Sequence, residues 1–275
     1  MTITLLSGII FLGAALAGFL GSLTGLGGGV VIVPLLALGL GVDIRYAIGA
    51  SLVSVIATSS GAAIAYVREG YSNIRAGMLL EVATTLGATL GAFLTLHAPT
   101  KIIAIIFGGV LLFSIIPFRM KHESTLAPDP LATRLRLDSS FPTTNGRKSY
   151  HVRHVPLGFL LMALAGALSG LLGIGSGAMK VLAMDRAMGF PFKVSTTTSN
   201  FMIGVTAAAS AGIFLRKGYI DPGLAMPTML GVLLGSLLGA RILARTPTAH
   251  LRRVFNVVLL VLGIEMIYNG LTGRL

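Results

Sequence analysis

Two glycine clusters lie at equivalent places in this sequence, each inside a long apolar stretch. The first comprises Gly25, Gly27, Gly28 and Gly29, and the second comprises Gly173, Gly175, Ser176 and Gly177. Neither has the spacing of a dinucleotide-binding motif or the lysine of a phosphate-binding loop. Glycines break an apolar helix and expose backbone N–H groups, and the half-helix that follows carries partial positive charge at its start. We expect the two breaks to form an anion site, although plain turns or close helix packing are the simpler alternative.

Polar side chains follow each cluster, early in the next apolar segment. The candidates for hydrogen bonds to an oxyanion are Ser51 and Ser54 in the first half of the chain and Ser199 and Asn200 in the second. Such groups can bind an anion without placing a full charge in a bilayer. Alternatively, they link helices or bond to the preceding helical turn. Ser51 and Ser199 are 148 residues apart, as are the two clusters, which favours a shared functional role.

Three charged residues lie inside apolar segments, where charge is costly and commonly functional. Lys180 follows the second cluster and could neutralise an anionic substrate, or its side chain could extend to the cytoplasmic membrane interface. Glu81 and Glu265 could each carry a coupling proton, or pair with an arginine such as Arg241. The histidines do not cluster and there is no cysteine, so we expect no metal site and no cofactor. No Ser-His-Asp arrangement or intramembrane carboxylate pair indicates an enzyme.

An internal repeat supplies most of these residues twice. Sliding the sequence by 148 residues aligns it with itself without a gap over roughly a hundred residues. The shift places Ala17-Gly18 on Ala165-Gly166, Gly70-Tyr71 on Gly218-Tyr219, and Pro99-Thr100 on Pro247-Thr248. Repeats of this size in a membrane protein are typical of transporters whose two halves move about a central site.

The composition places the repeated segments in a membrane. Of the 275 residues, 54% are hydrophobic and 11% are charged, whereas soluble domains have roughly a quarter charged residues. Mean hydropathy is +0.89, and apolar runs of about 20 residues, each able to span a bilayer, recur along the chain. These runs are continuous rather than alternating, which predicts helices rather than a barrel. We therefore expect an all-α polytopic membrane protein.

Each half has the same predicted order of elements. An apolar stretch broken by glycines comes first, at 5–40 and at 155–190. Three helices follow, expected at 44–67, 75–97 and 101–118 in the first half and at 193–215, 223–244 and 249–271 in the second. The two membrane domains are then 1–118 and 155–275. Between them, 119–154 is polar, basic and rich in Pro, Ser and Thr, and we expect it to be a disordered cytoplasmic linker.

The distribution of Lys and Arg indicates how each broken stretch meets the membrane. If each stretch enters and returns as a re-entrant hairpin, five positive charges lie on one side and fifteen on the other. If each stretch spans once, the split is twelve against eight. The positive-inside rule therefore favours hairpins, three further spans in each half and two inverted repeats, with both termini outside and the linker inside. Because the basic residues lie between apolar spans, the net charge of +12 gives no support for a nucleic-acid partner.

The motifs resemble the TauE/SafE family of sulfite exporters, also called the TSUP family. The likeness rests on the doubled unit, on the first cluster followed by Val30-Val31-Ile32-Val33-Pro34-Leu35-Leu36, and on Thr-Thr-Thr-Ser-Asn-Phe-Met at 196–202. It covers nearly all of the chain apart from the linker. The resemblance implies a secondary transporter in a plasma membrane of the bacterial inner-membrane type. Its implied substrates are sulfite, thiosulfate, or C2 and C3 sulfonates such as sulfoacetate.

The second half departs from the first at Ser176, Lys180 and Leu182, which predicts that the second cluster carries more of the substrate's charge. We expect an exporter of a small sulfur-containing anion that works by alternating access, with the anion held between the two clusters and the hydroxyl-rich helices. Two alternatives are open: an anion channel that uses the same clusters, and a non-transporting scaffold whose basic linker recruits a partner. The expected partners are the anion and the lipid bilayer. A seam of small residues such as Gly87-x-x-x-Gly91 could also pack a homodimer.

Overall fold

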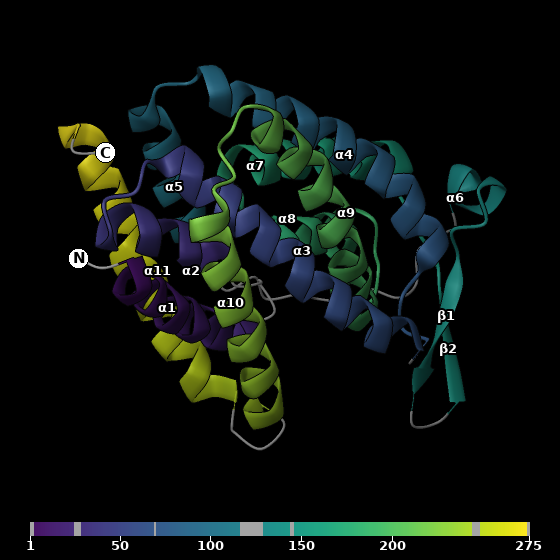
Figure 1. The fold of residues 1–275 in the computed structure, drawn as a ribbon. Helices are drawn as coiled ribbons and strands as arrows, with labels where there is room; N and C mark the ends of the chain where they lie inside the picture. Colours follow the sequence, from purple (N-terminus) through teal and green to yellow (C-terminus); the bar gives the residue numbers. More distant parts are fainter. Residues whose placement is uncertain are drawn as a thin grey trace.

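Long apolar helices make up most of the structure, a computed structural model that describes residues 3–24, 29–68, 70–115, 129–143, 146–243 and 248–273 (Figure 1). The first half contains α1 (Ile3–Thr24), α2 (Gly29–Pro34), the π-helical turn η1 (Leu35–Gly39), α3 (Ile44–Arg68), α4 (Ile74–His97) and α5 (Thr100–Ile115). The second half contains α7 (Val155–Leu172), α8 (Gly177–Leu182), η2 (Ala183–Ala187), α9 (Phe192–Arg216), α10 (Pro222–Leu243) and α11 (Thr248–Thr272). The two halves therefore have the same order of elements.

The outer surface of the bundle suits a membrane. By length and composition, three of the helices in the described residues can cross one: Ile74–His97, Val155–Leu172 and Phe192–Arg216. Large apolar side chains point outward along the first of these, where Leu86, Leu90 and Phe93 are 60%, 65% and 56% exposed. Because lipid solvates such a surface and water does not, the fold fits the membrane-protein class.

Small residues allow helices of opposite halves to pack closely. α4 packs against α7, and a Cβ added to Gly87 would lie 2.0 Å from the carbonyl oxygen of Ala163. α10 packs against α1 in the same way, since a Cβ added to Gly235 would lie 1.9 Å from the carbonyl oxygen of Ala15. The two contacts are related by the 148-residue repeat. Thus α4 of the first half packs on α7 of the second half, and α10 of the second half packs on α1 of the first.

Two cation–π contacts follow the same repeat. The guanidinium of Arg45 lies 5.9 Å from the centroid of the Tyr219 ring. The ammonium of Lys193 lies 3.7 Å from the centroid of the Tyr71 ring. Each contact joins the start of α3 or α9 to the turn before α10 or α4 of the opposite half, at a distance where such pairs attract. The halves are therefore interlocked at both ends of the bundle.

Part of the predicted linker is ordered. Its described residues form the short helix α6 (Pro130–Arg134) and an antiparallel hairpin of β1 (Ser139–Thr143) and β2 (Gly146–Tyr150), which lie at one end of the bundle (Figure 1). The prediction of disorder is wrong for this part, and the hairpin also corrects the all-α fold class to a mostly helical one. The first part of the linker, 119–128, lies outside the described residues.

A few apolar and polar contacts hold this small unit on the helices. Leu137, Tyr150 and Val152 are buried, and they pack in one hydrophobic cluster with residues of α4, α7 and α9. The Asn73 side-chain amide, just before α4, donates to the Leu137 carbonyl oxygen and to the Tyr150 hydroxyl, both at 2.8 Å. Burial raises the pKa of Tyr150 to about 12. The composition predicted disorder because the segment has few large apolar residues. The few that are buried are enough to dock it on the helices.

Candidate functional site

The second glycine break is buried between α3 and α9. α7 is followed directly by Gly173, which has a φ of +68°. Gly175 and Ser176 are also left-handed, with φ of +71° and +44°. A Cβ added to Gly173 would lie 2.8 Å from Cγ2 of Ile48 on α3, and one added to Gly175 would lie 3.0 Å from Cγ2 of Ile203 on α9. Glycine alone combines left-handed backbone with such close neighbours at low cost. The break is therefore a specified feature of the fold.

The two broken segments touch at Gly29, the first residue of α2. The remaining members of the first cluster lie outside the described residues: Gly25, Gly27 and Gly28. A Cβ added to Gly29 would lie 3.1 Å from the carbonyl oxygen of Gly173 and 2.8 Å from the hydroxyl oxygen of Ser51. The structure thus brings the second break against the start of α2.

Ser51 and Ser199 bind the backbone of the two segments in matched ways. The Ser51 hydroxyl lies 2.7 Å from the carbonyl oxygen of Gly173 and 3.4 Å from that of Gly29. The Ser199 hydroxyl donates to the carbonyl oxygen of Gly177 at 3.2 Å, which is the repeat equivalent of the Gly29 contact. Both residues therefore contact the backbone of the broken segments. Because each hydroxyl proton is used on a carbonyl, neither can be donated to an anion in this conformation.

Ser54 and Asn200, the other two polar candidates, are placed differently. The buried Ser54 hydroxyl donates to the carbonyl oxygen of Ala50, one turn earlier in α3, at 2.9 Å. This is the back-bonding role that such residues take as an alternative to ligand binding. Asn200 is partly buried on α9, directly after Ser199.

A buried charged network lies one helical turn beyond the second break. Lys180 on α8 is fully buried, and its ammonium donates to the Thr206 hydroxyl oxygen at 2.5 Å. The Thr206 hydroxyl in turn donates to Oε1 of Glu81 at 2.7 Å. Glu81 belongs to α4 of the first half, whereas Lys180 and Thr206 belong to the second, so the network joins the halves. The alternative in which Lys180 extends to the membrane interface is wrong, because protein encloses the whole side chain.

Two buried polar atoms at this place have no hydrogen-bond partner among the described residues. They are Oγ of Ser176, which is 3% exposed, and Oε2 of Glu81, which is 9% exposed. The backbone N–H of Lys180 donates to the carbonyl oxygen of Ser176 at 3.1 Å, so these two residues are one turn apart. Buried polar atoms are normally paired. These two oxygen atoms are therefore exceptions, and they belong to the network and to the turn before Lys180.

Glu265, the other predicted acidic residue, lies apart from this network. Its side chain is exposed on α11, between the outward-facing Val261 and Tyr268. The side chain of Arg241, considered as a partner for the intramembrane acids, lies outside the described residues.

Sequence reasoning identified Lys180 and Glu81 but did not join them through Thr206. One signal was available in the repeat. The equivalents of Lys180 and Glu81 are the apolar Ile32 and Met229, so both charges break the symmetry between the halves. Two charges that break the same repeat are candidates for a pair, because neither would be tolerated alone in an apolar interior.

Comparisons with known proteins place the chain among membrane transporters. "Probable membrane transporter protein YunE" of Bacillus subtilis (strain 168) is 27% identical over 263 residues, which cover 93% of this chain and 95% of that protein. "Probable membrane transporter protein MJ0441" of Methanocaldococcus jannaschii is 25% identical over 267 residues, 92% of each chain. No solved structure matches this chain.

A family model matches residues 10–266, which include both glycine clusters and the Lys180–Thr206–Glu81 network. That family is described as sulfite exporter TauE/SafE. Since the match covers nearly the whole chain, the protein belongs to the sulfite exporter TauE/SafE family.

Proposed function

We propose that this protein is a secondary transporter that exports small sulfur-containing anions such as sulfite, thiosulfate, or C2 and C3 sulfonates. Family membership supports this substrate class, and both relatives described above are named probable membrane transporter proteins. The membrane domains are 1–118 and 155–275, and the segment 119–154 lies on the cytoplasmic side of a plasma membrane.

The observation that carries the proposal is the fully buried Lys180 beside the second break. Its ammonium is a buried positive charge, paired with Glu81 through Thr206 in this conformation, to which an incoming anion can bind. Ser176, whose hydroxyl is unpaired, is one helical turn before Lys180. Hydroxyl and ammonium groups can both donate hydrogen bonds to the oxygen atoms of sulfite or a sulfonate. The substrate anion binds there, and the Ser51 and Ser199 hydroxyls exchange their carbonyl bonds for bonds to substrate as the site opens.

The mechanism is alternating access between inverted repeats, each with a re-entrant hairpin. The Arg45–Tyr219 contact supports this topology. With hairpins, these two residues lie on the same side of the membrane, whereas stretches that span once would put them on opposite sides.

Two measurements on purified protein test this function. Thermal denaturation is followed with sulfite, thiosulfate, sulfoacetate, taurine, sulfate and acetate, and the sulfur anions of the proposed class are expected to raise the midpoint. Equal stabilisation by acetate would overturn the substrate class. In proteoliposomes, radiolabelled thiosulfate is expected to enter by saturable counterflow against unlabelled internal thiosulfate. Non-saturable flux that follows the membrane potential alone would identify a channel instead.

A further inference from the structure

Lys180 and Glu81 balance each other's charge through Thr206 inside the bundle. The other titratable or charged residues on the helices that pack around this pair are distant from it along the chain. α7 has none. α4 has Arg75 and His97 near its ends, α9 has Lys193 and Arg216 near its ends, and η2, which follows α8, has Asp185 and Arg186. In the structure as it stands, the site thus holds one positive and one negative charge and is neutral.

An anion that binds Lys180 disturbs this balance. Lys180 then neutralises the anion, and Glu81 is left with an uncompensated negative charge at 9% exposure. Removing one partner from a buried pair is strongly unfavourable. Uptake of one proton by Glu81 restores neutrality for a monovalent anion, and Oε2 of Glu81 has no partner among the described residues that would block it.

We propose, on the basis of the proposed transport function, that Glu81 is a proton-binding site and that each anion crosses the membrane together with one proton. Two states of the site are stable. The empty site has Glu81 ionised and paired with Lys180, and the loaded site has the anion on Lys180 and a proton on Glu81. Anion alone or proton alone leaves one buried charge without a partner, so neither completes the cycle.

The repeat limits the number of such sites to one in each chain. At the first break, Ile32 and Met229 occupy the positions equivalent to Lys180 and Glu81. Neither side chain can be charged or carry a proton. Thr58, the equivalent of Thr206, instead bonds back to the Ser54 and Val55 carbonyl oxygens in its own helix. The expected stoichiometry is therefore one proton for each anion.

The coupling has a definite direction. A proton that travels with the anion draws the anion towards the more alkaline compartment, and one unit of pH difference acts as a concentration ratio of about tenfold. Net export then requires an outward anion gradient larger than the opposing pH gradient.

Proteoliposomes with the membrane potential held at zero by potassium and valinomycin test the coupling. With the interior one pH unit more alkaline, wild-type protein is expected to accumulate radiolabelled ethanesulfonate, a monovalent C2 sulfonate, about tenfold inside. Glu81→Gln mimics the protonated site, so it should keep ethanesulfonate exchange but lose accumulation driven by pH. Glu265→Gln is the matched control, an acid of the same type on an exposed face, and it should accumulate ethanesulfonate like wild type.

The outcomes separate the two proposals. Wild-type counterflow without accumulation driven by pH overturns proton coupling and leaves transport standing. Absence of wild-type counterflow overturns the proposed function and the coupling with it. If Glu81→Gln accumulates the anion as wild type does, the coupled proton binds at another residue and the proposal for Glu81 is overturned. If Glu81→Gln does not fold, proton uptake by wild-type protein in detergent decides. Ethanesulfonate added in weak buffer should remove about one proton per binding site from solution, and no uptake overturns the proposal.

Discussion

The Lys180–Thr206–Glu81 network shows what single residues contribute and what sequence can reveal about them. The sequence predicted that the hydroxyl-rich helices lie beside the two glycine clusters, and the structure places the Ser51 and Ser199 hydroxyls on carbonyl oxygens there. The sequence could not predict Thr206, because its partners come from α4 and α8, far away in sequence. The role of these residues in binding an anion is a proposal that the variants below test.

Buried pairs are costly to break and cheap to replace as a unit. Lys180→Met and Glu81→Met should each destabilise the protein by about 3–5 kcal/mol, because each leaves a buried charge without its partner. The double variant should recover most of that loss. The midpoints of thermal denaturation in detergent, compared as a double-mutant cycle, measure the coupling. A double variant whose destabilisation equals the sum of the two single effects would show that the groups do not interact.

Ser51 and Ser54 offer a matched pair of serines in one helix. Ser51→Ala leaves the buried Gly173 carbonyl without its side-chain donor and should cost about 1–3 kcal/mol. Ser54→Ala removes only a bond to its own preceding turn and should cost less.

Ser51→Ala and Ser199→Ala should also weaken thiosulfate binding, measured as the thermal shift at increasing thiosulfate. Unchanged affinity in both variants would remove these hydroxyls from the substrate site.

At the scale of elements, the long helices were the most predictable part. The predicted ranges of the helices that follow the broken stretches agree with the structure to within one residue, except at the end of α5, which borders residues that are not described: α3, α4, α5, α9, α10 and α11. Apolar runs bounded by Gly, Pro and charged residues fix such ends well. The π-helical turns η1 and η2 and the docked hairpin could not be predicted, since each depends on contacts with distant segments rather than on local pattern.

Glycine positions on the helices should differ sharply in their tolerance of alanine. Gly87→Ala would push Cβ to 2.0 Å from the Ala163 carbonyl oxygen and separate α4 from α7. Gly109 on α5 is the control, because a Cβ there meets no described atom within 4 Å. We expect Gly87→Ala to lower the denaturation midpoint clearly and Gly109→Ala to leave it unchanged or raise it slightly. Equal effects would mean that the α4–α7 seam does not limit stability.

The docked hairpin should respond to alkaline pH through Tyr150. Its buried hydroxyl has a pKa of about 12, whereas the undocked segment should have the ordinary value near 10. The free segment therefore loses its proton first, so docking is fully stable below about pH 10 and is lost as pH rises through about 12. The difference between absorbance titrations of wild type and Tyr150→Phe should show one tyrosine that ionises late. If the titration difference between the two proteins instead had its midpoint near pH 10, the hairpin would not be docked with Tyr150 buried.

At the scale of the whole molecule, the repeat predicted two matched halves but not their interlocking. A duplicated sequence is compatible with halves that lie side by side or with halves that exchange helices. The structure shows exchange, since α1 packs on α10 and α4 packs on α7 (Figure 1). The halves as the sequence defines them therefore cannot separate as rigid bodies. In the proposed alternating-access cycle, we expect the moving units to be two mixed bundles: in one, α10 packs on α1 and α3, and in the other, α4 packs on α7 and α9.

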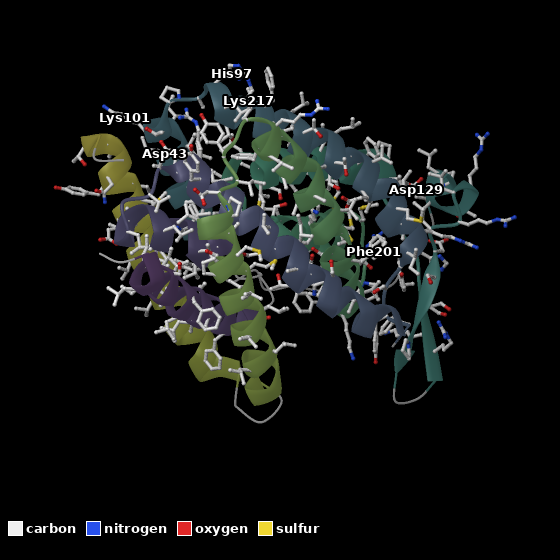
Figure 2. The ribbon with its side chains drawn as sticks, in the orientation of Figure 1. Asp43, His97, Lys101, Asp129, Phe201 and Lys217 are labelled. Atoms are coloured by element: carbon white, nitrogen blue, oxygen red, sulfur yellow. The ribbon has the colours of Figure 1, made fainter. Side chains whose placement is uncertain are left out.

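The proposed inverted topology makes a prediction that the chain is well suited to test, because it contains no cysteine. Lys101, Lys148 and Lys217 are exposed, the first and last of them at the positions labelled in Figure 2, and each can be replaced by a single cysteine. With re-entrant hairpins, Lys101→Cys and Lys217→Cys face outside and Lys148→Cys faces the cytoplasm. A membrane-impermeant maleimide should then label the first two in intact spheroplasts and the third only after permeabilisation. If each broken stretch instead spanned once, Lys217→Cys would share the side of Lys148→Cys, opposite Lys101→Cys, so the pairing of labels alone distinguishes the two topologies.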